Sequence, residues 1–235
     1  MIPWRAKNYW TQFWMHFAGT GVGGRIATHF GSLFVSKYGG RCQLAYKNRK
    51  GYISPKATIE HNNLMIGHHV YIGDRVIIYN VGDGGRVELG DDVRLFGDTY
   101  IHTGQGGNVK IDKNTHIQPC CHLLAYKASI EIGQNVQIAP RCAFYPYDHG
   151  ILPGELIWKQ PLTTKGNIKI GDDVWLGFGV IVLSGVRIGE GAVVGAGSVV
   201  THSIPDGAIA VGTPARVIKM RSDIEASGLK NSSPR

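Results

Sequence analysis

Aliphatic side chains recur at every sixth position over most of this chain, in groups of three. The groups begin at residues 66, 89, 111, 132, 170 and 188, and each covers three hexads, or 18 residues. The position four residues after each aliphatic is also small or aliphatic, as at Val70, Thr99 and Cys121. Because side chains alternate between the two faces of a strand, both columns point to the same face. The pattern therefore predicts three short strands in each repeat of 18 residues.

The glycine content fits a chain that turns a corner after every short strand. Glycine contributes 33 of the 235 residues, about twice its usual share, and often follows the aliphatic residue. Three strands and three corners make a triangular coil, and stacked coils make a parallel β-helix. The aliphatic positions of the six groups are Ile66, Ile72, Ile78, Leu89, Leu95, Ile101, Ile111, Ile117, Leu123, Ile132, Ile138, Phe144, Ile170, Leu176, Val182, Ile188, Val194 and Val200.

The repeat is interrupted once, between the groups that begin at residues 132 and 170. This interval exceeds one coil by 20 residues, so we expect residues 145–167 to form a loop outside the helix. Long loops on rigid scaffolds commonly carry function. The loop contains Asp148, His149 and Glu155, whose side chains can all take part in proton transfer.

Residues 1–52 lack the hexads. Two groups of apolar residues recur there at the spacing of an amphipathic helix, namely Trp10, Phe13, Trp14 and Phe17, and then Ile26, Phe30, Leu33 and Phe34. The end of a β-helix exposes unpaired strand edges and needs a cap. We therefore expect a partly helical, basic and aromatic arm that caps the first coil.

The net charge of +8 comes from this N-terminal region. Residues 1–59 contain nine Lys or Arg and no Asp or Glu, whereas the rest of the chain is nearly neutral. A second interpretation is that residues 1–40 contact an anionic membrane surface or a lipid-linked sugar. We do not expect a nucleic acid as partner, because the arm has no recognised binding motif.

The cysteine pattern is typical of free thiols in a reducing compartment. Four cysteines show no metal-ligand spacing, and Cys120 and Cys121 are adjacent. His116 and His122 are six residues apart and would lie on different faces of one coil, so we expect no catalytic metal. The chain has no apolar run long enough to cross a membrane and no clear secretory signal. We expect a cytoplasmic protein, with peripheral contact at the inner face of the membrane as the alternative.

Four motifs occur in a fixed order after residue 147. They are Asp148-His149-Gly150, the segment VWLG at 174–177, the segment GAGSVVT at 195–201, and the segment GTPARVIK at 212–219. Together they resemble the hexapeptide-repeat acetyltransferases that use acetyl-CoA, close to those acting on maltose, galactosides and polysaccharides. The resemblance implies an all-β, left-handed parallel β-helix of about six or more coils, with an N-terminal helical arm, an extended loop and a short C-terminal segment. It also implies a homotrimer with active sites between subunits.

The resemblance assigns the role of general base to His149. An imidazole that is neutral near pH 7 can take the proton of a sugar hydroxyl as its oxygen attacks a thioester. Asp148 or Glu155 would orient the His149 ring. The implied reaction moves an acetyl group from acetyl-CoA to a sugar or glycan hydroxyl, in surface polysaccharide or lipid-linked glycan synthesis. The alternatives are N-acetylation of an amino sugar and a non-catalytic scaffold or binding protein.

The same resemblance places acetyl-CoA on six residues, which are Trp175, Gly177, Ala196, Thr201, Arg216 and Lys219. Phe178 and His202 differ from the residues usual in the family. The expected division of the chain is an arm over 1–52, a β-helix over 53–204 with its loop at 145–167, and a tail over 205–235 beside the CoA.

Overall fold

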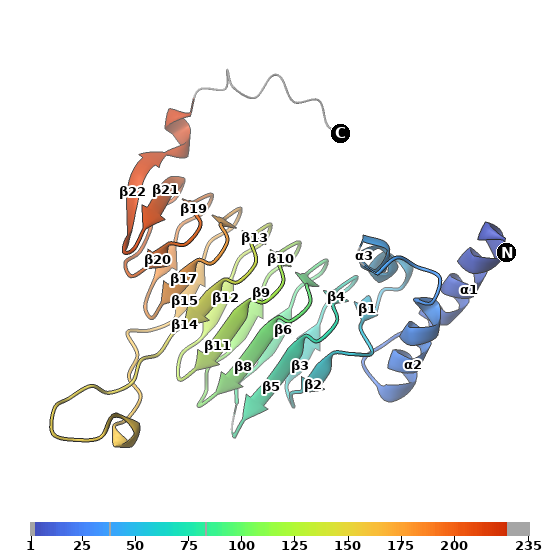
Figure 1. The fold of residues 1–235 in the computed structure, drawn as a ribbon, viewed down its shortest axis with the longest axis horizontal. Helices are drawn as coiled ribbons and strands as arrows, with labels where there is room; N and C mark the ends of the chain where they lie inside the picture. The colour runs from blue at the N-terminus through green and yellow to red at the C-terminus, as the bar shows by residue number, and fades with distance from the viewer. Residues whose placement is uncertain (1–2, 38, 83, 225–235) are drawn as a thin grey trace.

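The β-strands of this chain coil into a three-sided parallel β-helix (Figure 1). The computed structural model describes residues 3–37, 39–82 and 84–224, so residues 225–235 of the expected tail lie outside the described part. Every strand pairs in parallel with its equivalent in the next coil, except for one antiparallel pair at the C-terminal end. The predicted parallel β-helix with N-terminal helices, an extended loop and a C-terminal segment is confirmed.

The three sides of the β-helix are named here sheets A, B and C. Sheet A contains β1 (Tyr52–Ile53), β4 (Tyr71–Ile72), β7 (Arg94–Leu95), β10 (His116–Ile117), β13 (Gln137–Ile138), β16 (Trp175–Leu176), β19 (Val193–Val194), β21 (Ala208–Gly212) and β22 (Ala215–Met220). Sheet B contains β2 (Thr58–Glu60), β5 (Ile77–Val81), β8 (Tyr100–Gly104), β11 (His122–Tyr126), β14 (Ala143–Tyr145), β17 (Ile181–Leu183) and β20 (Val199–Val200). Sheet C contains β3 (Leu64–Ile66), β6 (Val87–Leu89), β9 (Val109–Ile111), β12 (Ile130–Ile132), β15 (Ile168–Ile170) and β18 (Arg187–Ile188).

The core is the stack of inward-pointing columns that the hexads predict. It is one continuous cluster of buried side chains that runs from Ile53 to Ala215. Cys121 and Cys142 are fully buried in it, at equivalent positions of neighbouring coils. Their thiols donate to the carbonyl oxygens of Ala139 and Gly177, at 3.3 and 3.2 Å. We therefore regard both cysteines as packing residues.

The N-terminal residues form helices at one end of the β-helix, opposite the β21–β22 hairpin (Figure 1). These elements are α1 (Trp4–His16), α2 (Val22–Gly31), α3 (Gly39–Leu44) and the 3₁₀ turn η1 (Ala45–Lys47). Met15 and Leu44 form a second buried cluster with Tyr52 and Tyr71 of the first two coils. The helices thus cover the first coil on the side where Met15 lies. Two further 3₁₀ turns are η2 (Ile157–Lys159) and η3 (Arg221–Asp223).

Candidate functional site

The loop that interrupts the repeat leaves sheet B after β14 and rejoins sheet C at β15, so it lies at the corner between these two sheets. It projects away from the body of the β-helix (Figure 1). At its base, the backbones of Asp148 and Thr163 exchange two hydrogen bonds, each of 2.8 Å. This pairing joins the two arms of the loop and gives it a fixed root.

Gln160 holds the outer part of the loop together. Its side chain is buried, its amide nitrogen donates to the carbonyl oxygens of Leu152 and Glu155, each at 2.9 Å, and its oxygen accepts from the Leu152 amide at 2.8 Å. A side chain at Gly150 would lie only 2.6 Å from the Cβ of Gln160. The loop is therefore a packed turn of chain built around one glutamine.

His149 lies exposed on this loop. It lines an open concavity of 500 Å³ together with Glu155, Leu156, Ile157 and Trp158. Trp158 is 75% exposed, which is unusual for such a large apolar side chain on a protein surface that binds no partner. The imidazole thus sits beside apolar surface that a second molecule can cover.

The two carboxylates expected to orient His149 have different surroundings. The Asp148 carboxylate accepts a hydrogen bond of 2.9 Å from the Ser184 hydroxyl. Glu155 lines the same concavity as His149. Neither carboxylate is hydrogen-bonded to the His149 ring within the described residues. Asp148 fixes the root of the loop to the next coil, and Glu155 is the carboxylate that shares the concavity.

Five of the six residues assigned to acetyl-CoA lie along one side of the molecule. Trp175 is 55% exposed on β16, and its register across sheet A passes through Val193 and Ile209 to Lys219. Three strand spacings of about 4.8 Å place Trp175 and Lys219 roughly 14 Å apart in one row. An extended ligand can bind along this row.

Gly177, Ala196 and Arg216 follow a parallel line at the corner between sheets A and B. A Cβ on Gly177 would lie 2.6 Å from the Ala196 nitrogen, so only glycine allows the two coils to stack here. A Cβ on Gly195 would lie 2.7 Å from the side chain of Val211, which is in register with Arg216. Arg216 and Lys219 are exposed, and neither forms an ion pair in the part of the chain that the structure describes. We call the line of Gly177, Gly195 and Ala196 the glycine ridge. Two cations without an ion-pair partner beside this ridge can bind phosphates.

Thr201 does not join the other five residues. It follows β20 and lies at the corner between sheets B and C, where its hydroxyl contacts the His202 ring at 2.8 Å. This is the corner from which the loop of His149 projects. Within one chain, His149 and Thr201 therefore lie at one corner, and Gly177 and Ala196 lie at another.

A cluster of aromatic residues that the hexad pattern does not predict lies on the outer face of sheet B. We call it the tyrosine–histidine band, and its members are Tyr79, Tyr100, His102, Tyr126, Tyr145 and Tyr147. Tyr79 and His102 are in register and stack with ring centroids 4.4 Å apart, and Tyr126 lies 5.7 Å from Tyr147 at the start of the loop. The band therefore leads along sheet B to the loop of His149.

Burial changes the acid–base properties of the band. His102 is half-buried, and burial lowers its pKa. Burial and the hydrogen bond to Tyr79 raise the pKa of Tyr100. The sequence signal that could have revealed the band is the alternation of aromatic residues at outward positions in register, such as Tyr79 and His102.

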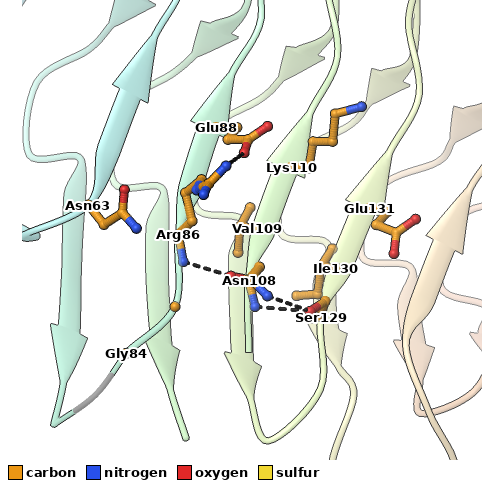
Figure 2. Close-up of a pocket in the computed structure, with 11 residues that line it drawn as sticks. Asn63, Gly84, Arg86, Glu88, Asn108, Val109, Lys110, Ser129, Ile130 and Glu131 are labelled. Atoms are coloured by element: carbon orange, nitrogen blue, oxygen red, sulfur yellow. Dashed lines mark hydrogen bonds and ion pairs between the residues drawn. The ribbon is translucent and has the colours of Figure 1, made fainter. Parts of the chain in front are cut away.

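A charged concavity on sheet C is not a good candidate for the site. Figure 2 shows Glu88, Lys110 and Glu131, which lie in one row across three strands with alternating charge. Glu88 pairs with Arg86 at 2.7 Å, and Glu131 pairs with Lys169 at 3.2 Å. Lys110 pairs with Asp112 at 3.1 Å, so each charge of the row already has a partner of opposite sign. We therefore interpret the row as a set of surface ion pairs that stabilise the sheet.

No group of three metal-binding side chains occurs in residues 3–37, 39–82 and 84–224. In the same residues, no helix is both long and apolar enough to cross a membrane.

Comparison with known proteins adds to this geometry. Residues 167–202 match the family model described as bacterial transferase hexapeptide (six repeats). A probable acetyltransferase of Mycobacterium tuberculosis is 36% identical over 165 residues, which are 70% of this chain and 47% of that protein. The galactoside O-acetyltransferase of Lactococcus lactis is 36% identical over 128 residues, which are 54% of this chain and 56% of that protein. The chain thus spans about half the length of the named relatives that it matches.

Two solved structures share the fold. The polySia-specific acetyltransferase NeuO has a TM-score of 0.59 at 25% identity, with 73% of this chain and 76% of that chain covered. A variant of AntD, an N-acyltransferase from Bacillus cereus, has a TM-score of 0.54 at 27% identity, covering 69% of this chain and 82% of that one. That structure contains dTDP-4-amino-4,6-dideoxyglucose and coenzyme A. Residues 167–202 thus carry the hexapeptide repeat of the bacterial transferases, and the β-helix is similar in fold to these acyltransferases.

Proposed function

We propose that this protein transfers an acetyl group from acetyl-CoA to a hydroxyl of a sugar or glycan, with His149 as general base. The observation that carries the proposal is the exposed His149 on a braced loop that interrupts a hexapeptide-repeat β-helix. We choose acetyl as the transferred group because the similar proteins from Mycobacterium tuberculosis and Lactococcus lactis are named acetyltransferases.

The chemistry assigned to His149 is a proton transfer. A ring nitrogen of the neutral imidazole takes the proton of the acceptor hydroxyl while the oxygen attacks the thioester carbon. The carbon–sulfur bond breaks, the acetyl group stays on the sugar oxygen, and the proton passes to the CoA sulfur. Glu155, which lines the same concavity, is our candidate for the group that orients the ring.

The acyl donor fits the face that carries Trp175, Ala196 and Arg216. Gly177 and Gly195 leave the corner without side chains, so the pantetheine arm can approach the backbone there. The exposed Arg216 and Lys219 would pair with the phosphates of CoA. The structure of the AntD variant, which contains coenzyme A, supports this choice of donor.

The acceptor is proposed to lie along the tyrosine–histidine band. Tyrosine rings offer flat apolar faces to the carbon side of a sugar ring, and their hydroxyls can bond the sugar hydroxyls. The band reaches the loop through Tyr126 and Tyr147. A longer glycan would contact several members of the band, which fits a role in surface polysaccharide or lipid-linked glycan synthesis.

We also propose that the site is shared between copies of the chain in a homotrimer. His149 lies at the corner between sheets B and C, whereas Gly177 and Ala196 lie at the corner between sheets A and B. A neighbouring copy would bring its own glycine ridge to His149. The exposed apolar residues of the loop, such as Trp158, would be covered by that contact.

The test is acetyl transfer by the purified protein with acetyl-CoA and a panel of soluble hexosides. We expect His149→Ala to lower kcat at least about 100-fold, because a positioned general base contributes a factor of about 10² to 10⁴. His29→Ala, at an exposed histidine of α2, is the matched control and should keep full activity. Equal acceptor-dependent rates for wild type and His149→Ala would reject the general base, and no turnover by any variant would favour a scaffold.

A second candidate acceptor is an amino sugar, because the similar AntD structure contains an amino-deoxyglucose nucleotide. The product distinguishes the two reactions. Alkaline hydroxylamine removes an acetyl ester from oxygen but leaves an acetamide intact. A hydroxylamine-resistant product would assign N-acetylation in place of O-acetylation.

A further inference from the structure

The two N-terminal helices and the turns that follow them present an apolar surface that no described part of the chain covers. We call it the aromatic face, and its members are Trp10, Phe13, Phe17, Ile26, Phe30, Leu33 and Phe34. Phe13 is 59% exposed, Ile26 is 52% exposed and Leu33 is 51% exposed. Soluble proteins seldom leave so many large apolar side chains exposed together unless something binds them.

The aromatic face is one continuous surface across the two helices. The rings of Trp14 and Phe30 stack with centroids 4.8 Å apart, which joins α1 to α2. The indole nitrogen of Trp10 donates to the Phe30 carbonyl oxygen at 2.8 Å, and the Trp10 ring lies 6.1 Å from Phe34. These contacts hold the exposed rings in place before any partner arrives.

The capping role of the arm uses a different side of α1. Met15 is fully buried in the cluster with Tyr52 and Tyr71, and the Asn48 amide donates to the Met15 carbonyl oxygen at 2.6 Å. Capping therefore accounts for the Met15 side of the helix. It leaves the aromatic face without an explanation.

The charge around the aromatic face has one sign. No Asp or Glu occurs in residues 1–59, and Arg5, Lys37 and Lys50 are exposed basic residues of this region. The Lys7 ammonium lies 5.9 Å from the centre of the Phe34 ring, so positive charge reaches the aromatic face itself. A second copy of the same face would meet this charge with the same sign, which opposes self-association through it.

We propose that the aromatic face docks on the surface of an anionic lipid bilayer. Aromatic residues with a rim of Lys and Arg are the composition of helices that lie in the interfacial region of a membrane. The helices contain 13 and 10 residues, which is too short to span a bilayer and suits a helix lying along its surface. This docking would place the β-helix beside acceptors that are carried on lipids, and it is independent of the chemistry at His149.

The experiment is flotation of the full chain with phosphatidylcholine vesicles and with vesicles that also contain phosphatidylglycerol. We expect at least tenfold more protein bound to the anionic vesicles at low salt, with a marked decrease at high salt. The double variant Phe13→Ser/Phe17→Ser should lose most of this binding. Met65→Ser, at an exposed apolar residue on sheet C, is the matched control and should float like wild type.

Two further measurements make the result decisive. Thermal unfolding and acetyl transfer to a soluble hexoside should be unchanged in the double variant, since both phenylalanines are more than half exposed. Equal flotation of the double variant and wild type would overturn the proposal. A second result would also overturn it. If wild type does not float and light scattering shows that the double variant forms a smaller assembly than wild type, the aromatic face joins copies of the chain.

Discussion

At the scale of single residues, the neighbours of an outward-pointing side chain determine its burial and its pKa. His102 is on an outward position of β8, yet its ring is half-buried because it stacks on Tyr79 and lies 5.8 Å from Tyr126. The imidazole loses water there, and burial lowers its pKa below the ordinary value of 6.5. A histidine of this kind makes the stability of the β-helix depend on pH.

We predict that His102→Phe makes the protein less sensitive to acid. The folded chain holds His102 neutral, whereas the unfolded chain takes up a proton as the pH falls through about 6.5. The free energy of unfolding should therefore fall with decreasing pH from about 6.5 down to the lower pKa of the folded state. Phenylalanine keeps the stacking on Tyr79 and binds no proton, so this part of the slope should disappear.

The measurement is the urea midpoint of wild type and His102→Phe between pH 7 and pH 5. His61 and His116 also have pKa values lowered by burial, so some acid sensitivity should remain in the variant. Parallel curves for the two proteins over this range would contradict the prediction.

At the scale of elements, the coils were predictable and the contacts between distant segments were not. The hexads predicted the inward columns because every coil repeats the same steric demand, and the helical spacing of Trp10, Phe13 and Trp14 was visible in the same way. The position of the loop followed from the one long interval. Its internal packing did not, because a hydrogen bond from Gln160 to Leu152 has no periodic signal.

The same reason explains what the sequence left open about the site. The resemblance assigned Thr201 and Trp175 to one ligand, but only the coil geometry places Trp175 on sheet A and Thr201 at the corner between sheets B and C. The tyrosine–histidine band was missed because outward positions can hold any polar or aromatic residue without disturbing the repeat. Tyr79 and Tyr147 are far apart in sequence and belong to one band only once the coils are stacked.

We predict that Gln160→Ala loosens the loop without unfolding the β-helix. The substitution removes three hydrogen bonds, and each polar group left unpaired in a buried position costs about 1–3 kcal/mol. The loop should then open locally, because its root at Asp148 and Thr163 is separate from the Gln160 contacts. Acetyl transfer should fall mainly in kcat, since His149 would be less well positioned.

Amide hydrogen exchange of residues 150–162 is the measurement for this loosening. Lys159→Ala, next to Gln160 but exposed, is the control and should exchange like wild type. If Gln160→Ala shows unchanged exchange in the loop, the glutamine does not hold it together.

At the scale of the whole molecule, the separation of His149 from the glycine ridge has a direct consequence for assembly. Sheet B lies between the two corners, so a site within one chain would have to reach from one edge of sheet B to the other. A ring of copies solves this problem, because the corner of one copy can meet the other corner of the next. Each active site would then need two chains.

We predict that two inactive variants restore activity when they share one assembly. His149→Ala removes the proposed base, and Ala196→Tyr places a large ring on the exposed ridge where the CoA arm is proposed to lie. Co-expression with two different tags, followed by purification on both, isolates assemblies that contain each variant. In a trimeric ring of either mixed composition, one of the three contacts joins an intact His149 to an intact Ala196, so activity should return to about one third of wild type. A dimeric ring would return about one half, and a site contained within one chain would return none, because every chain in the mixture carries a damaged site.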